Sequence, residues 1–355
     1  MPHGAQGYKF CQQSSRQEQK QAEPNRGRLQ FWSKSSCQTC RDPSLQFGCI
    51  PLVPSPPVVQ GVDGATKRPF SRNLLRRHKM AEKIAFQGEL GAYSHEACVA
   101  SRPDHEPLPC ATFEDVIAAV KTGAAEFAML PVENTTYGRV ADMHRLLPES
   151  GLFINDEVFV RVRINLLALP GVALSDIKVA RGHLVILPQC RKFLDAHGIR
   201  GEAAADNAGA AADIAARNER TAAALASELA GRIHGLEVLQ KDVEDQNHNT
   251  TRFLVMSAQN LPERRRGKML TSFVFQVRNI PAALYKAMGG FATNGVNMIK
   301  LESYMLGGAF RATQFYADIE GHPDDPEVKR AFDELAFFTD MIRVLGTYPA
   351  DPGRP

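Results

Sequence analysis

The sequence lacks long apolar runs and a regular cysteine pattern, and these two absences limit the class of protein. No apolar run reaches the roughly 18 residues that a membrane-spanning helix needs, and the first residues lack the apolar core of a secretory signal. The 7 cysteines are odd in number and scattered, which is typical of reduced thiols rather than of a disulfide framework. We therefore expect a cytoplasmic globular protein with no membrane partner.

Acidic and basic residues are unevenly distributed. The chain has a net charge of +3, but residues 1–79 hold 13 of the 42 Lys and Arg residues and only 4 of the 39 Asp and Glu residues. The rest of the chain is mildly acidic, which argues against nucleic acid as its main partner. Cys37 and Cys40 have the spacing of two zinc ligands, but no second pair completes a tetrahedral site. We expect no metal and no cofactor.

Residues 1–79 are rich in Gln, Ser, Arg and Pro, hold 8 of the 22 prolines, and show no sustained periodicity. Such a segment cannot bury enough apolar surface to offset the entropy lost on ordering, so we expect a disordered extension. A basic, acid-poor leader is also typical of a transit peptide. A third interpretation is that the native protein starts at Met80, which stands directly before a strand pattern.

Strand and helix patterns alternate from Met80 to residue 260. The expected strands are residues 84–86, 126–130, 151–163, 166–169, 178–180 and 202–204, and the expected helices are 93–100, 112–121, 140–147, 187–197, 208–217 and 221–234. Ser94 is the expected N-cap of the first helix. The alternation predicts an α/β fold with one or two mostly parallel sheets. Ligands in such folds bind beyond the carboxyl ends of the strands.

The pattern changes near residue 262. Residues 261–269 include three consecutive arginines and are typical of a polar linker. Behind them, strands at 271–277, 297–305, 309–318 and 341–347 and helices at 282–294 and 326–339 give the order βαββαβ, which is the ferredoxin-like order. The expected domains are therefore residues 80–260 and 270–348.

The most informative segment is residues 249–256, which begin polar and continue as a strand pattern. Successive side chains of a strand point to opposite faces, so Thr251 and Phe253 share one face and Arg252 takes the other. A hydroxyl donor beside a fixed cation suits a site that binds an anion and helps a leaving group depart. Taken alone, the segment is better interpreted as an ordinary strand entry with a solvated arginine.

Four further segments are polar and lie where strands end or helices begin, namely residues 88–94, 131–138, 183–190 and 206–211. Unpaired N–H groups at helix N-termini bind carboxylates. Each segment also has a purely structural interpretation as a cap or a turn. Their combination and order favour a binding site.

These motifs resemble a known family. Residues 83–257 resemble prephenate dehydratase, with residues 131–138 (PVENTTYG) close to its Pro-Ile-Glu-Asn-Ser/Thr pattern and residues 249–253 (NTTRF) as the second specific motif. Residues 270–347 resemble the ACT regulatory domain, with residues 281–284 similar to its Gly-Ala-Leu loop and residues 300–303 similar to its Glu-Ser-Arg-Pro motif. The resemblance implies a catalytic domain of two lobes, arranged like a periplasmic binding protein with the site between them.

The resemblance also implies an activity and its control. Prephenate would be converted to phenylpyruvate, carbon dioxide and water in phenylalanine biosynthesis, phenylalanine would inhibit at the ACT domain, and the chain would form a homodimer or homotetramer. Thr251 would assist departure of the ring hydroxyl, and Arg252 would either hold the side-chain carboxylate of the substrate or serve the structure. The implied substrate-binding residues are Ser94, Glu133, Asn134, Thr135, His183, Arg252 and Phe253, and the implied effector-binding residues are Pro281, Ala282, Ala283, Leu284, Glu302 and Ser303.

The sequence departs from the family pattern at several positions. Arg163 stands where the family usually has His, Gly182 where it has Ser, and Asn207 where it has Thr. Tyr304 and Met305 replace the Arg-Pro of the effector motif. These departures favour the first of three alternatives, a non-catalytic protein that binds a small acid. The others are an arogenate dehydratase, which a plastid leader at residues 1–79 would favour, and an amino-acid sensor that uses only the ACT domain.

Overall fold

The computed structural model describes residues 82–261, 267–305 and 312–354, so the extension 1–79 and the question of Met80 lie outside the described residues. The described chain is a mixed α/β protein with three sheets. None of its described helices combines the length and the hydrophobicity that crossing a bilayer requires.

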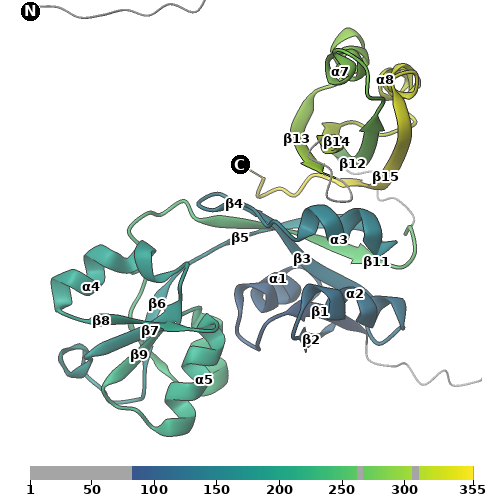
Figure 1. Ribbon diagram of the computed structural model, residues 1–355. Helices are drawn as coiled ribbons and strands as arrows, with labels where there is room; N and C mark the ends of the chain where they lie inside the picture. The colour runs from purple at the N-terminus through teal and green to yellow at the C-terminus, as the bar shows by residue number, and fades with distance from the viewer. Residues whose placement is uncertain (1–81, 262–266, 306–311, 355) are drawn as a thin grey trace, which may run out of the picture. The chain divides into compact units, whose positions relative to one another are not determined.

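The first sheet has the strand order β2-β1-β3-β11-β5 (Figure 1). Its strands are β1 (Lys83–Gln87), β2 (Glu106–Cys110), β3 (Phe127–Asn134), β5 (Phe153–Arg161) and β11 (Thr250–Ser257), with the short β4 (Gly138–Arg139) paired to β3. Strands β2, β1 and β3 are parallel, whereas β11 is antiparallel to both of its neighbours. One face packs on α1 (Tyr93–Ser101) and the other on α2 (Phe113–Lys121) and α3 (Met143–Ser150).

The second sheet has the order β10-β6-β9-β7-β8. Its strands are β6 (Asn165–Ala168), β7 (Val179–His183), β8 (Arg200–Ala204), β9 (Ala222–Ala226) and β10 (Glu237–Gln240), and its helices are α4 (Arg191–His197), α5 (Asn207–Arg217) and α6 (Glu228–His234) with short 3-10 turns η1 (Leu174–Asp176) and η2 (Leu187–Cys190). Strands β7, β8 and β9 are parallel, but β6 and β10 are antiparallel to their neighbours. Both sheets are therefore mixed, and the prediction of mostly parallel sheets was wrong.

The prediction of one helix over residues 221–234 was also wrong. Its first half is strand β9, whose five residues are all buried between β6 and β7. Helix α6 begins only after Ser227, whose hydroxyl accepts a hydrogen bond from the N–H of Ala230. Alanine favours helix locally, but burial of a fully apolar run in the middle of a sheet overrides that preference.

The first helix likewise starts differently from the prediction. Helix α1 begins at Tyr93 and its N-cap is Ala92, without a side-chain cap, so Ser94 is the second residue of the helix rather than its cap. Strand β2, which the sequence analysis did not include, contains Pro107 and Pro109. It pairs only with β1 at the edge of the sheet, where proline is tolerated.

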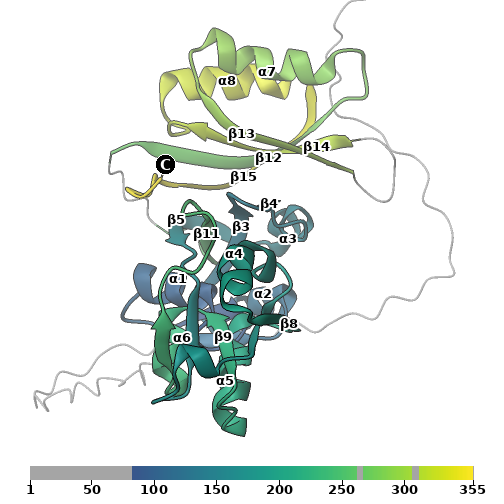
Figure 2. The same cartoon turned by 90° about the vertical axis from the view of Figure 1, so that its left-hand side faces the viewer.

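The third sheet is antiparallel, with the order β13-β14-β12-β15. Its elements are β12 (Met269–Val277), α7 (Ala283–Thr293), β13 (Met298–Met305), β14 (Ala312–Glu320), α8 (Pro326–Ala336) and β15 (Thr339–Pro349), the βαββαβ order that the sequence predicts. Helices α7 and α8 lie side by side on one face of this sheet (Figures 1 and 2). Phe273, Phe291 and Phe332 pack between the helices and the sheet, with ring centroids 4.9 to 5.9 Å apart.

The other face of the third sheet shares a hydrophobic core with the first sheet. Leu270, Val274, Tyr316, Leu345 and Tyr348 belong to the same buried cluster as residues of β3, β5, β11, α2 and α3. Gly346 of β15 lies directly against the backbone of Ile154 in β5, because a Cβ at position 346 would overlap the Ile154 carbonyl oxygen and stand 2.8 Å from its carbonyl carbon. Absence of a side chain at position 346 thus permits the close approach of β15 to β5.

Substitution Gly346→Ala should therefore push β15 away from β5. We expect it to lower the free energy of unfolding by about 1–3 kcal/mol, the usual range for overpacking a core, measured by urea denaturation. Gly289→Ala is the matched control, because Gly289 lies in α7 with nothing within 4 Å of an added Cβ. The control should stabilise by about 0.5–1 kcal/mol, and an equally stable Gly346→Ala protein would contradict the proposed close approach.

Candidate functional site

Asn134 and Thr251 join the two most specific motifs of the sequence. They lie opposite each other on the antiparallel strands β3 and β11, although 117 positions separate them in the chain. The side-chain amide of Asn134 donates to Thr251 Oγ1 at 2.9 Å and to Asn249 Oδ1 at 2.6 Å. Its own oxygen accepts the backbone N–H groups of Thr136 and Tyr137. Because each atom of the amide has partners of the right kind, this network determines its orientation.

The amide network continues to the second sheet. Asn249, which is 2% exposed, donates through Nδ2 to Gln189 Oε1 at 2.6 Å. Gln189 belongs to η2, which follows β7, and its amide donates to the carbonyl of Val185 at 2.9 Å. The phenol of Tyr137 also donates to the Val185 carbonyl. Side-chain amides thus link the ends of β3 and β11 to a loop of the second sheet.

Gln189, Asn249 and Tyr137 were not among the predicted site residues. All three lie in polar segments that the sequence singles out, but no local signal shows which side chain of a segment turns toward another segment. Asn249 had the best signal, because it begins the same motif that contains Thr251. Mutual contacts are visible only once the two sheets are folded.

The hydroxyl of Thr251 is half-buried and held from one side only. Its oxygen accepts the hydrogen bond from Asn134, and within the described part of the chain its proton is donated to no other residue. A hydroxyl has one donor and two acceptor positions. The Thr251 proton is therefore available to an acceptor atom of a bound molecule.

Thr135 joins the end of β3 to the start of β11 by hydrogen bonds. Its hydroxyl donates to the carbonyl of His248 at 2.8 Å and accepts the N–H of Thr250 at 2.9 Å, and its own N–H donates to the carbonyl of Thr250. These bonds hold residues 248–250 against the end of β3. They give Thr135 a structural role beside the predicted binding role.

His183 lies at the end of β7, apart from the hydrogen bonds that hold Thr251. Its N–H donates to Asn207 Oδ1 at 2.8 Å, and its ring Nδ1 accepts the N–H of Val185 at 3.3 Å. A Cβ at Gly182 would stand 3.2 Å from Leu225 Cβ and 3.4 Å from Asn207 Oδ1. Two of the departures from the family pattern, Gly182 and Asn207, are therefore neighbours.

The third departure, Arg163, lies on the surface. Its side chain is 63% exposed and its guanidinium stands 3.5 Å from a carboxylate oxygen of Asp242. The carbonyl of Arg163 accepts a hydrogen bond from the phenol of Tyr93, the first residue of α1, at 2.8 Å. The contact to α1 uses only the backbone of residue 163.

Arg252 occupies the opposite side of β11 and is 2% exposed. Its Nε donates to Glu157 at 2.8 Å, its Nη1 donates to Glu133 at 2.8 Å and to Asp318 at 2.7 Å, and its Nη2 donates to the phenol of Tyr348 at 2.9 Å. A guanidinium with these partners is not presented to a ligand. Of the two roles considered for Arg252, the structure favours the structural one.

Glu133 and Phe253 also have partners inside the protein. The carboxylate of Glu133 contacts Arg252 and the ammonium of Lys300, the latter at 2.7 Å. Phe253 is 2% exposed and packs with Ile84 and Phe86 in the core between the first sheet and α1. Both side chains are thus held by partners within the protein, and their contact with substrate stays a prediction.

The charges around Arg252 reinforce one another. Burial by itself would raise the pKa of Asp318. The adjacent Arg252 guanidinium and the Ser272 hydroxyl lower this pKa by more than burial raises it, so the net pKa lies below its usual value. Burial would likewise raise the pKa of Glu133, and Lys300 together with Arg252 lowers it overall. Both groups are therefore carboxylates at neutral pH.

The predicted effector residues occupy two segments of the third sheet and its helices. Ala282 is the N-cap of α7, with a left-handed φ of 57°, between the exposed Pro281 and the buried Ala283, and Leu284 is half-buried. Glu302 and Ser303 lie on β13. Lys300, on the same strand, places its ammonium 3.3 Å from a carboxylate oxygen of Glu302.

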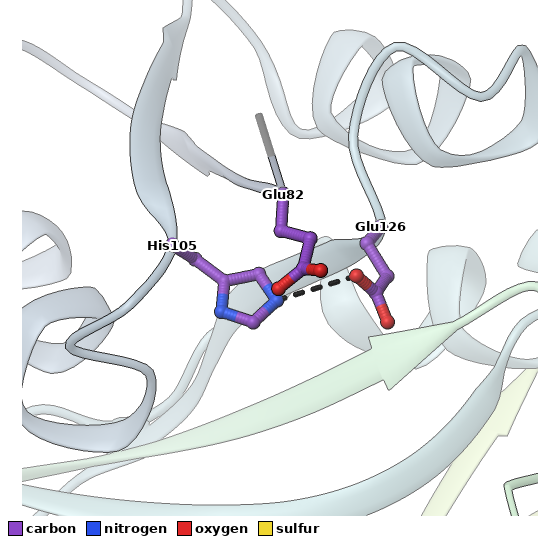
Figure 3. A group of neighbouring side chains, drawn as sticks. All are labelled: Glu82, His105 and Glu126. Atoms are coloured by element: carbon purple, nitrogen blue, oxygen red, sulfur yellow. Dashed lines mark hydrogen bonds and ion pairs between the residues drawn. The ribbon is translucent and has the colours of Figure 1, made fainter. Parts of the chain in front are cut away.

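Glu82, His105 and Glu126 form a cluster with possible metal ligands (Figure 3). They precede β1, β2 and β3, at the end of these parallel strands opposite to Asn134. His105 Nε2 faces Glu126 at 3.3 Å, and its buried Nδ1 has no hydrogen-bond partner among the described residues. A histidine that ligates a metal normally donates its other ring N–H to a neighbour. The arrangement therefore fits a His–Glu hydrogen bond better than a metal centre.

Comparison with known proteins gives a consistent result. The family model described as prephenate dehydratase matches residues 84–261. A bifunctional N-acyl-homoserine lactone acylase/prephenate dehydratase from Komagataeibacter europaeus is 50% identical over 273 residues, which cover 76% of this chain and 97% of that protein. The chloroplastic arogenate dehydratase/prephenate dehydratase 2 of Arabidopsis thaliana is 36% identical over 296 residues, covering 80% of this chain and 78% of that protein.

A solved structure extends the similarity to the third sheet. The prephenate dehydratase of Arthrobacter aurescens in complex with L-Phe superposes with a TM-score of 0.68 at 27% sequence identity. The match covers 77% of this chain and 91% of that chain. The structural match therefore covers more of this chain than the family match at residues 84–261, and it includes residues of the third sheet.

Substitution Asp318→Asn tests the charge cluster around Arg252. Since the folded pKa of Asp318 lies below its ordinary value of 3.8, its contribution to stability is complete above pH 3.8 and is lost as the pH falls through the lower folded pKa. At pH 7 the variant should lose about 3 kcal/mol, because a buried cation loses a partner. Its stability should also depend less on pH below about 4, as measured by urea denaturation from pH 7 to pH 3.

Glu320→Gln is the control for that measurement, because it removes the carboxylate of the partly exposed Lys268–Glu320 ion pair of the same sheet. We expect no measurable loss of stability in the control at pH 7. Equal stability of wild type and Asp318→Asn at pH 7 would contradict the structural role of the cluster.

Proposed function

Since the chain belongs to the prephenate dehydratase family, we propose that it converts prephenate to phenylpyruvate, carbon dioxide and water. The observation that carries the proposal is the hydrogen bond of Asn134 to Thr251, because it joins both specific motifs around one hydroxyl with an available proton. Family membership favours catalysis over the alternative of a non-catalytic binding protein.

The reaction sets few chemical requirements, because formation of an aromatic ring provides the driving force. The bond between the ring carbon and its carboxylate breaks, and the electron pair enters the ring as carbon dioxide forms. The ring C–O bond breaks at the opposite carbon, and the departing hydroxide takes up one proton to leave as water. Hydroxide is a poor leaving group, so a donor at that oxygen is the main requirement.

Thr251 is the residue that we assign to the leaving oxygen. A threonine hydroxyl is not acidic, so it donates a hydrogen bond or passes on a proton from solvent rather than acting as a free acid. The hydrogen bond from Asn134 fixes the Thr251 oxygen, so that its proton can be directed to the substrate. Ser94, Thr135 and His183 remain the candidates for the carboxylates of the substrate, while Asn134 serves mainly to orient Thr251.

Regulation by phenylalanine forms the second part of the proposal. We assign the first two sheets, within residues 80–260, to the two lobes of a catalytic domain, residues 261–269 to a linker, and residues 270–348 to an ACT regulatory domain. The Arthrobacter aurescens prephenate dehydratase, which matches over 91% of its length, contains L-Phe. This similarity supports phenylalanine as the inhibitor, and a homodimer or homotetramer remains the expected assembly.

Arogenate remains the alternative substrate. It differs from prephenate in carrying an amine instead of the keto group on its side chain. The Arabidopsis thaliana relative is named for both dehydratase activities. Parallel assays with prephenate and arogenate, with the product identified as phenylpyruvate or phenylalanine, distinguish the two.

An N-acyl-homoserine lactone acylase activity is a second candidate function. The observation that favours it is the 50% identity to the Komagataeibacter europaeus protein over 97% of that protein's length. If the activity is present, incubation with a long-chain N-acyl-homoserine lactone should release fatty acid and homoserine lactone in proportion to enzyme, as followed by mass spectrometry. No release above the level of a heat-inactivated sample would exclude this function.

Substitution Thr251→Ala should lower kcat for prephenate by about 10²–10⁴, the usual contribution of one positioned proton donor. KM should change much less, because the contact strengthens as the C–O bond breaks. Phenylpyruvate absorbance in a steady-state assay measures both constants.

Thr251→Ser is the matched control, because it keeps the hydroxyl and removes only a methyl group. It should retain most of the wild-type kcat. If Thr251→Ala remains within about threefold of wild type, well below the contribution of one positioned donor, the proposed role of Thr251 is wrong.

A further inference from the structure

Two neighbouring residue pairs of β3 and β11 face in different directions. Thr251 lies opposite Asn134, and the next residue, Arg252, lies opposite Glu133. Because side chains alternate along a strand, the first pair belongs to the candidate site and the second pair faces the third sheet. The register of the strands shifts directly after Arg252, and such a bulge interrupts the regular ladder. The two pairs therefore lie together on one side of the bulge.

The third sheet holds the second pair at two points of different character. Arg252 binds Asp318, whose side chain is 0% exposed, and is itself 2% exposed. Glu133 binds Lys300, but their side chains are 35% and 12% exposed. The first contact is a buried anchor that cannot be broken without leaving an uncompensated charge. The second contact reaches solvent and can change at lower cost.

Lys300 links Glu133 to the predicted effector segment. Its ammonium lies 2.7 Å from Glu133 Oε2 and 3.3 Å from Glu302 Oε1. Glu302 is one of the residues expected to bind the effector, and an amino acid carries an ammonium group of its own. An effector ammonium that pairs with Glu302 would compete with Lys300 for that carboxylate. Lys300 would then pair more strongly with Glu133, the neighbour of Asn134.

We propose that the Lys300–Glu133 ion pair transmits effector binding on β13 to the Asn134–Thr251 pair, with Arg252 as the fixed positioning residue. This inference rests on the proposed function for the identity of the effector and of the reaction. Coupling of this kind typically changes affinity by about 5–150-fold. It requires only a change of partners at one partly exposed ion pair, and no large movement of the sheets.

Substitution Lys300→Met is the test, because methionine keeps most of the length of the side chain and removes its charge. The half-inhibitory concentration of phenylalanine should rise at least tenfold, while kcat without phenylalanine stays within about threefold of wild type, since Lys300 has no contact with Thr251 or Asn134. Phenylalanine should still bind, as measured by isothermal titration calorimetry. Lys300→Arg, which restores the charge, should recover most of the inhibition.

A second readout does not depend on catalysis. Phenylalanine should change the amide hydrogen exchange of peptides covering residues 131–139 and 249–257 in the wild type, and this change should be absent in Lys300→Met. Lys268→Met is the matched control, because Lys268 pairs with Glu320 on the same sheet, whereas the described partners of Glu133 are Arg252 and Lys300. The control should respond to phenylalanine like the wild type.

The outcomes separate this inference from the proposed function. An unchanged exchange response and inhibition in Lys300→Met would overturn the inference, and so would a variant that no longer binds phenylalanine, since Lys300 would then belong to the effector site itself. A wild type that does not bind phenylalanine would overturn it even if prephenate is converted. The wild type could fail to convert prephenate and still show an exchange response to phenylalanine that is absent in Lys300→Met. This result would refute the proposed function and support the coupling.

Discussion

The buried guanidinium of Arg252 is the interaction on which the arrangement of the described chain depends. It is surrounded by carboxylates from three strands, with Glu133 on β3, Glu157 on β5 and Asp318 on β14, and by the phenol of Tyr348 on β15. A cation removed from water is tolerated only where such partners satisfy it, and loss of one partner leaves a costly unpaired charge. The cluster need not make the protein more stable than an apolar core would. It does require these strands from two sheets to meet in a single arrangement.

Strand geometry transfers this requirement to the candidate site. Arg252 and Thr251 are consecutive residues, so fixing one side chain on the face toward the third sheet fixes the direction of the other on the opposite face. Glu133 and Asn134 have the same relation on β3. The position of the Thr251 hydroxyl therefore depends on residues near the end of the chain. The close approach of Gly346 to Ile154 has the same consequence, because it seats the third sheet on β5.

Local patterns predicted the parts of this structure that local forces determine. The alternation along residues 249–256 correctly separated Arg252 from Thr251, and the βαββαβ order of the third sheet followed from short periodic segments. For the alanine-rich residues 222–226, local propensity wrongly predicted a helix. These residues form a strand because they are buried between β6 and β7. The arginine run near residue 265 predicted a domain boundary, but no local pattern indicated that Tyr316 and Leu345 share a buried core with the first sheet. No nearby residue could have indicated that the partners of Arg252 lie 66 and 96 positions further on.

The distribution of charge between the two faces suits the proposed reaction. The ring carboxylate of prephenate must lose its negative charge as carbon dioxide forms, and a cation paired with it would stabilise the starting state more than the transition state. Arg252 and Lys300 are instead held by carboxylates on the face toward the third sheet. The groups that position Thr251 are the neutral amides of Asn134, Asn249 and Gln189. Neutral donors can orient a hydroxyl toward a leaving oxygen without retaining the carboxylate that has to depart, so the separation of Arg252 and Lys300 from the amides is compatible with the proposed reaction.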